Sequence, residues 1–223
     1  AAECAATEGA RLGQLGSAEV ARDIEVIRRA LGEDRISFVG ISYGTLLGQL
    51  WAEWYPTSVR ALVLDGVVSA EARGGAGGSM AQVRGVQSSF VAIAHACTAD
   101  PACPLADDGG LGAAYDELAR RIESGAVQGS AVGPTQLTYA AFWATYDQET
   151  WPRLWAAVAS GLDGDLSAIA DLAGSFTRLV AYAPFAIVSC LDDPHPKGYD
   201  EWQEGAEAFV ERSPRFGQVL SNE

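Results

Sequence analysis

Residues 36–45 are Ile-Ser-Phe-Val-Gly-Ile-Ser-Tyr-Gly-Thr, and this stretch decides the fold of the chain. It begins with apolar residues typical of a buried strand and continues as Gly-x-Ser-x-Gly, the nucleophile-elbow pattern. At such a turn the backbone of Ser42 is strained and its hydroxyl is exposed, and side chains at Gly40 or Gly44 would crowd the turn or the neighbouring strand. The pattern predicts Ser42 as a nucleophile and the backbone N–H of Tyr43 as an oxyanion-hole donor.

The segments on both sides of the elbow follow the order of an α/β unit. A helix is predicted over 45–55 and is closed by Pro56, and an apolar strand follows at 60–65. Before the elbow, apolar residues recur at helical spacing over 18–31, with Ser17 as the predicted N-cap. This order predicts parallel strands that are buried on both faces. The context favours a nucleophile over an ordinary serine in a tight turn.

Charge and composition exclude several classes of function. The chain has 223 residues and a formal net charge of −14, from 29 acidic and 15 basic residues. Such a chain has little positive charge with which to neutralise nucleic acid or an anionic membrane surface. It has no apolar run that approaches the roughly 18 residues of a membrane span, and no signal peptide is visible. Its first residues resemble a start inside a longer chain.

The cysteines indicate an oxidising compartment. Cys97 and Cys103 flank a polar loop with a proline, which predicts a small disulfide loop. A zinc site is disfavoured, because no paired histidine or further cysteine lies nearby. Cys4 and Cys190 either pair with each other or have partners outside the chain, and their spacing does not decide between these. We predict no metal site and no cofactor.

The pattern becomes helical after the second predicted strand, beyond a Gly-rich joint at 74–78. Apolar spacing then predicts helices at 80–96, 111–122, 136–146, 150–162 and 166–179, an extended segment or strand at 183–189, and a helix at 201–211. The helices predicted between residues 80 and 179 form a helical insert that follows a strand of the α/β unit.

Residue runs typical of one protein family occur along nearly the whole chain. They are residues 21–24, 31–36, 40–48, 55–56 and 63–67, and more loosely 97–105, 151–154, 164–165 and 187–192. These runs resemble the actinobacterial tripeptidyl aminopeptidases, which are exported α/β-hydrolases related to prolyl aminopeptidases. The resemblance implies an α/β fold: a partial α/β-hydrolase core with parallel strands and a nucleophile elbow, and a large helical cap insert. We expect the core at 1–70, the helical cap domain at 71–186, and the cap exit with a return towards the core at 187–223.

The resemblance also implies an activity. The family members are serine hydrolases that release short peptides from a free N-terminus, so the expected partner is a peptide substrate and the expected location is the cell envelope or the medium. Ser42 would be the nucleophile and Tyr43 N–H one oxyanion donor. The family's Gly-rich oxyanion loop lies upstream of Cys4, and its catalytic Asp and His lie beyond Glu223. We therefore expect the remaining segments of the precursor to supply them, and expect this chain alone to be inactive.

The two histidines of the chain are poor candidates for the catalytic base. His95 falls on a predicted helix, where a role in the cap is favoured over the geometry of a triad. His195 follows the nucleophile in the required order, but it lies between two prolines at the cap exit. Asp65 ends a strand and resembles a structural turn more than a catalytic acid.

An aminopeptidase must hold a cationic α-amine, which calls for a carboxylate near the nucleophile. Asp192 and Asp193 are the candidates, against the alternative that they form a solvated turn before Pro194. Trp143, Trp151 and Trp155 either line an acyl pocket or, as their helical spacing favours, belong to a core. Two other functions stay open, namely an esterase or lipid hydrolase with the same elbow and a catalytically incomplete binding module.

Overall fold

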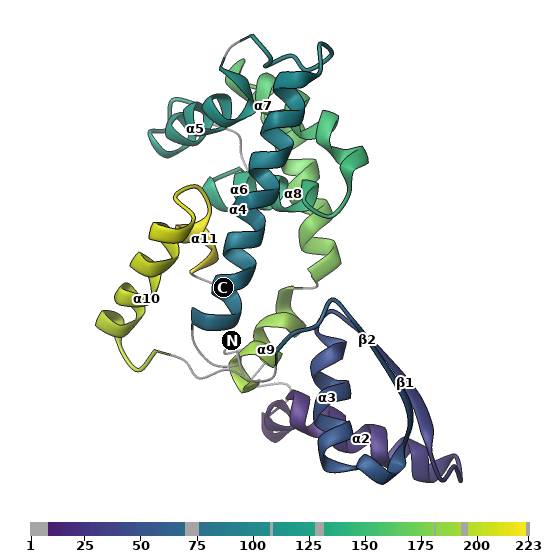
Figure 1. Cartoon of the computed structure of the whole chain (residues 1–223). Coiled ribbons are helices and arrows are strands. Elements are labelled where there is room, and N and C mark those ends of the chain that lie inside the picture. Colours follow the sequence, from purple (N-terminus) through teal and green to yellow (C-terminus); the bar gives the residue numbers. More distant parts are fainter. Residues whose placement is uncertain are drawn as a thin grey trace. The chain divides into compact units, whose positions relative to one another are not determined.

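The computed structural model describes residues 9–69, 76–107, 109–127, 132–180, 182–192 and 196–221. The chain divides into two compact units (Figure 1). The first comprises Ala1–Ser79 and Ala183–Lys197, and the second comprises Met80–Tyr182 and Gly198–Glu223. We describe each unit by itself.

The first unit is a small α/β assembly. Its elements are η1 (Gly9–Gln14), α2 (Ser17–Ala30), β1 (Ile36–Ile41), α3 (Gly44–Trp54), η2 (Pro56–Ser58), β2 (Val59–Asp65) and α9 (Tyr182–Asp192). The two strands are parallel and pair Phe38 with Leu62 and Ile41 with Asp65. Helix α3 packs against both strands, and α2 packs against α3 (Figure 1). The predicted parallel α/β arrangement is therefore present.

The two faces of the sheet differ in burial. On one face, Phe38 packs against a core formed by Ala21, Leu46, Leu50 and Trp51. A Cβ added at Gly48 would lie 2.9 Å from a methyl carbon of Leu64, so this glycine lets α3 approach the sheet. On the other face, Val39, Ile41 and Val63 are 55–67% exposed. Within the described residues, the prediction of burial on both faces is thus met on one face only.

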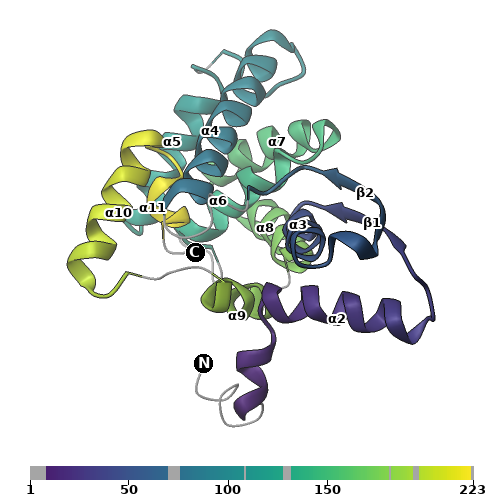
Figure 2. The ribbon, with the colours of Figure 1, turned by 60° about the horizontal axis from the view of Figure 1, so that its bottom comes forward.

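The second unit is helical (Figure 2). Its elements are α4 (Ala76–Ala99), α5 (Gly110–Glu123), α6 (Pro134–Ala144), η3 (Gln148–Thr150), α7 (Trp151–Leu162), α8 (Ser167–Val180), α10 (Tyr199–Arg212) and α11 (Gly217–Leu220). The five helices predicted between residues 80 and 179 and the helix predicted at 201–211 are all present. Trp155 is buried in the core of this unit, and Trp143 and Trp151 pack against it, as their helical spacing favoured.

The last segment of the chain packs within the helical unit. The fully buried ring of Phe216 forms edge contacts with Phe90 and Tyr115, at centroid distances of 5.2 and 5.7 Å. Phe209 and Leu220 join the same core. The predicted domain boundaries stay predictions. Residues 198–221 were expected to return towards the α/β core, but their contacts lie within the helical unit. The reason is that these apolar side chains are buried among the helices.

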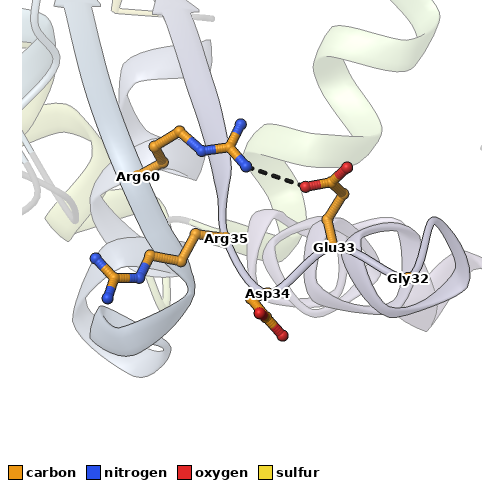
Figure 3. Close-up of a pocket in the computed structure, with 5 residues that line it drawn as sticks. All are labelled: Gly32, Glu33, Asp34, Arg35 and Arg60. Carbon is orange, nitrogen blue, oxygen red and sulfur yellow. Dashed lines mark hydrogen bonds and ion pairs between the residues drawn. The ribbon is translucent and has the colours of Figure 1, made fainter.

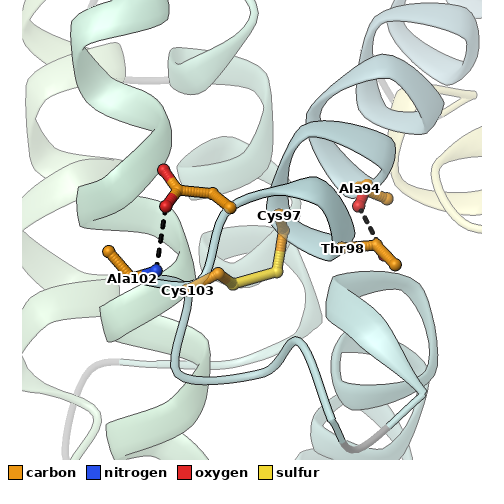
Figure 4. The surroundings of a disulfide bond; sticks show 6 residues. Ala94, Cys97, Thr98, Ala102 and Cys103 are labelled. Carbon is orange, nitrogen blue, oxygen red and sulfur yellow. Dashed lines mark hydrogen bonds between the residues drawn. A yellow bond between two sulfur atoms is a disulfide. The ribbon is translucent and has the colours of Figure 1, made fainter.

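A disulfide closes the loop after α4, as predicted (Figure 4). Cys97 and Cys103 are both buried, with an S–S distance of 2.05 Å. Inside the loop, the backbone N–H of Ala102 donates to the carboxylate of Asp100 at 2.8 Å. Cys4 lies outside the described residues, so its predicted alternatives of pairing stay open.

The segment predicted as extended or strand at 183–189 is instead part of helix α9. The prediction was wrong because a short apolar run fits a strand or a buried helix equally well. Pro184 is compatible with the helix, since it lies in the first turn, where its missing N–H has no intrahelical partner to lose. The N-cap of α2 is Gly16 and not the predicted Ser17. No helix in the described part of the chain combines the length and the apolar character needed to cross a membrane.

Candidate active site

Ser42 has the backbone conformation of a nucleophile elbow. Its φ is +51°, and among the described residues it is the only one other than glycine with a positive φ. An L-residue in this region is strained, and such strain concentrates at functional sites. Ser42 is also exposed, directly after the end of β1 and before α3 begins at Gly44. The strained backbone therefore places an exposed serine at the carboxyl end of the parallel strand β1.

The two glycines of the pattern have different surroundings. A Cβ added at Gly40 would lie 2.5 Å from the carbonyl oxygen of Gly44 and 3.0 Å from the ring of Phe38. The turn therefore requires a glycine at position 40, as expected. A Cβ added at Gly44 would meet no atom of the described residues within 4 Å. The expectation of crowding is thus wrong for Gly44 within this part of the chain.

Backbone hydrogen bonds tie the elbow to β2 and to α3. The N–H of Ser42 donates to the carbonyl oxygen of Asp65, the last residue of β2, at 2.9 Å. The N–H of Thr45 donates to the carbonyl oxygen of Ser42, also at 2.9 Å. Gly66, with a φ of +66°, then turns the chain away close to the backbone of Ser42. The strained residue is therefore bonded on both sides.

Thr45 is a support of the elbow that the sequence analysis did not single out. Its side chain is fully buried, and its hydroxyl donates to the carbonyl oxygen of Ser42 at 2.6 Å. The same hydroxyl accepts from the N–H of Val68 at 2.9 Å. The side-chain amide of Gln49 donates to the carbonyl oxygens of Thr45 and Val68 at 3.0 and 2.8 Å. The available signal was a hydroxyl-bearing residue directly after the Gly-x-Ser-x-Gly pattern, in the first turn of α3.

Tyr43 and Asp192 meet at the elbow although they are far apart in sequence. The hydroxyl of Tyr43 donates to Oδ2 of Asp192 at 2.5 Å. Oδ1 of the same carboxylate accepts from the backbone N–H of Ser17, at the start of α2, at 2.8 Å. Of the predicted site residues, the structure therefore brings together Ser42, Tyr43 and Asp192, and Asp193 lies outside the described residues.

We assign no catalytic base for Ser42 among the residues that the structure describes. His95 is exposed on α4 and belongs to the helical unit, and His195 lies outside the described residues. The carboxylate of Asp65 is at an exposed strand end, and it is the carbonyl of this residue that contacts the elbow. Among the residues that the structure covers, no cluster of three or more His, Cys, Asp or Glu is placed to hold a metal ion.

The α/β unit has a surface hollow (Figure 3). It is lined by Gly32, Glu33, Asp34, Arg35 and Arg60, and its Arg60–Glu33 ion pair is 3.0 Å long. These residues adjoin the amino-terminal ends of the strands, whereas Ser42 follows the carboxyl end of β1. Six strand residues separate the two ends by about 20 Å. The hollow is therefore not part of the candidate site.

Comparison with known proteins agrees with this geometry. Residues 4–108 match the family described as alpha/beta hydrolase fold. The parallel strands, the elbow and the helical segment that follows them match the same architecture. The fold is that of a partial α/β-hydrolase with a helical insert.

Curated relatives of this chain carry protease and esterase names. The chain is 39% identical to serine protease Hip1 of Mycobacterium tuberculosis over 97 residues, which are 44% of this chain and 18% of that protein. It is 41% identical to tripeptidyl aminopeptidase of Streptomyces lividans over 66 residues, 30% of this chain and 12% of that protein. It is 34% identical to carboxylesterase B of M. tuberculosis over 231 aligned residues, 95% of this chain and 43% of that protein. The resemblance to tripeptidyl aminopeptidases is thus confirmed, and the chain spans less than half the length of each of these relatives.

Proposed function

We propose that the whole protein is a serine hydrolase that releases short peptides from free N-termini through an acyl-enzyme on Ser42. The observation that carries this proposal is the exposed Ser42, which has a φ of +51° and lies in the turn between the parallel strand β1 and helix α3. In the reaction, Oγ of Ser42 attacks the substrate carbonyl, and the backbone N–H of Tyr43 donates to the developing oxyanion. The tetrahedral intermediate then collapses: the peptide C–N bond breaks, the amine leaves with the proton that the base took from Ser42, and the short peptide stays as an ester on Oγ of Ser42. Water hydrolyses this ester and frees the short peptide as its carboxylic acid.

The proposal assigns the catalytic base and its acid to segments of the protein outside the described residues. A serine is a weak nucleophile unless a neighbouring base takes its proton. The order nucleophile, acid, histidine in α/β-hydrolases is compatible with partners that follow the helical insert. In this scheme the helical unit is a cap that shapes the substrate pocket. The remaining segments are either continuous with this chain or present as separate chains of the same precursor.

Two further parts of the proposal concern the substrate and the compartment. The carboxylate of Asp192 near the elbow supports binding of a cationic α-amine, and Asp193 is proposed for the same task. Each carboxylate oxygen has two lone pairs, so Asp192 keeps acceptor capacity beyond its two bonds to Tyr43 and Ser17. The Cys97–Cys103 disulfide supports an exported protein of the cell envelope or the medium, because such bonds persist in oxidising compartments.

An esterase is the second candidate, because carboxylesterase B aligns with almost the whole chain. The two functions differ in their need for a free amine. The test compares a tripeptide p-nitroanilide, its N-acetylated form and p-nitrophenyl butyrate as substrates of the full-length protein. The aminopeptidase proposal predicts turnover of the free-amine peptide and loss of most of it on acetylation. Turnover of the ester, with equal or no turnover of the two peptides, would instead support the esterase.

A further inference from the structure

Asp192 joins three segments that are remote in sequence. It is the last residue of α9, and its carboxylate accepts from the side chain of Tyr43, 149 residues away, and from the backbone of Ser17, 175 residues away. One oxygen serves each donor, at 2.5 Å for Tyr43 and 2.8 Å for Ser17. The carboxylate therefore ties α9 to the elbow and to the first turn of α2.

The surroundings of this carboxylate are closely packed. A Cβ added at Gly16 would lie 3.1 Å from Oδ1 of Asp192 and 3.4 Å from Cβ of Leu191, so the glycine makes room for the end of α9. Ser17 is only 1% exposed. The half-buried Tyr43 packs against the apolar core of the α/β unit while its hydroxyl reaches Asp192. Both ends of the Tyr43 side chain are thus restrained.

We propose that Asp192 is a positioning residue of the elbow, which orients the backbone N–H of Tyr43 by holding the hydroxyl of the same residue. This inference rests on the proposed function, in which that N–H donates to the oxyanion. An oxyanion donor must lie about 2.7–3.1 Å from the oxygen, so a small rotation of the peptide between Ser42 and Tyr43 weakens its bond. A hydrogen bond to a charged acceptor is stronger than one to a neutral acceptor and resists that rotation.

The positioning role and the role of α-amine ligand predict different kinetics. A ligand of the amine contributes to peptide binding, so its loss raises KM for the peptide and leaves a substrate without an amine unaffected. A positioning residue acts on the transition state, so its loss lowers kcat for every substrate that forms the oxyanion. Removing the hydroxyl of Tyr43 distinguishes the two roles further. This change breaks the bond to Asp192 but leaves the carboxylate and its charge available to an amine.

The experiment compares Tyr43→Phe, Asp192→Asn and the double variant in the full-length protein. Asp200→Asn, an exposed residue of α10 in the helical unit, is the matched control. The substrates are a free-amine tripeptide p-nitroanilide and p-nitrophenyl acetate, which has no amine. We expect both single variants to lower kcat about tenfold on both substrates, because a misplaced Tyr43 N–H stabilises the oxyanion of the transition state less well. In Tyr43→Phe, KM for both substrates stays within about twofold, since the carboxylate of Asp192 and ground-state binding are unchanged. The double variant is no slower than the slower single variant, because the two residues form one bond.

Two results would overturn the inference. The first is an unchanged kcat for the ester in Asp192→Asn, and a higher KM for the peptide alone in that variant would make Asp192 an amine ligand with no positioning role. The second is unchanged kcat in Tyr43→Phe, which removes a single hydroxyl and so carries the test even if Asp192→Asn unfolds. Failure of the proposed function is a separate outcome: the wild-type protein would then not react with a fluorophosphonate. Normal labelling of the wild type with equal labelling rates in both variants contradicts the positioning role alone.

Discussion

The backbone N–H of Ser42 donates to the carbonyl oxygen of Asp65 at 2.9 Å and so holds the elbow to the end of the neighbouring strand. This bond keeps Ser42 at a φ of +51°, a conformation that costs an L-residue roughly 1–2 kcal/mol. The strain is therefore balanced by contacts of the α/β unit itself. Its consequences are measurable without an assay of activity.

We predict that Ser42→Gly is more stable than Ser42→Ala by about 1 kcal/mol, because glycine adopts a positive φ without steric cost. The measurement is the free energy of unfolding of the full-length protein in a denaturant titration. The same pair of substitutions at Ser175, inside helix α8, is the control and should show the opposite sign, since alanine is the better helix former. Equal signs at both positions would contradict the strained elbow.

Gly40→Ala should destabilise the protein by about 1–3 kcal/mol through overpacking. The added methyl group would lie 2.5 Å from the carbonyl oxygen of Gly44, a backbone atom that cannot move without displacing the start of α3. Gly85→Ala, at an exposed position of α4 with no atom within 4 Å of the added Cβ, is the control and should be neutral or stabilising. Thermal melting of both variants checks this, and a harmless Gly40→Ala would show that the turn is looser than described.

Thr45→Val should lower the free energy of unfolding by about 1–3 kcal/mol, because the N–H of the half-buried Val68 loses the fully buried Thr45 hydroxyl as its acceptor. The substitution keeps the shape of the side chain and removes only its hydroxyl. Thr177→Val, at an exposed position on α8, should change stability by less than about 0.5 kcal/mol. Similar losses in the two variants would indicate a general effect of valine in helices and would remove Thr45 as a support of Ser42.

Glu25 should stabilise the α/β unit in a pH-dependent way. Its pKa is lowered from 4.5 to about 2, chiefly by hydrogen bonds from Arg28 and then from Arg29 and Ser58, which outweigh the opposite effect of burial. A carboxylate with a depressed folded-state pKa stabilises the fold fully above its ordinary pKa, and this contribution is lost as the pH falls from about 4.5 towards 2. We therefore expect Glu25→Gln to be less stable than the wild type by about 1.5–3 kcal/mol at pH 7.

The measurement for Glu25 is the difference in free energy of unfolding between wild type and variant from pH 7 down to pH 2. This difference should be constant above about pH 5 and shrink below it. Glu19→Gln removes an exposed ion pair with Arg22 on the same helix and should cost less than about 1 kcal/mol. A difference that grows as the pH falls would contradict the depressed pKa.

The local features of the elbow could be predicted from the sequence, because they depend on neighbouring residues. Strand, Gly-x-Ser-x-Gly and helix occupy consecutive positions, and the short-range steric demand at Gly40 is contained within the pattern itself. The disulfide was predictable for the same reason, since Cys97 and Cys103 are six residues apart.

Features that depend on distant segments could not be predicted. The bond between Tyr43 and Asp192 spans 149 residues, and no periodicity encodes it. The helical state of 183–189 was missed because the run is short and apolar, and burial on one face of the sheet depends on which segments cover it. The packing of Phe216 into the helical unit likewise follows from tertiary contacts with Phe90 and Tyr115.

The most direct test of the central claim is covalent labelling of the full-length, folded protein with a fluorophosphonate, followed by mass spectrometry of its peptides. The claim that Ser42 is the nucleophile predicts one phosphonate adduct, on Ser42, and no adduct in Ser42→Ala at the same concentration and time. Absence of labelling in the folded wild-type protein, or an adduct on another residue that persists in Ser42→Ala, would contradict it.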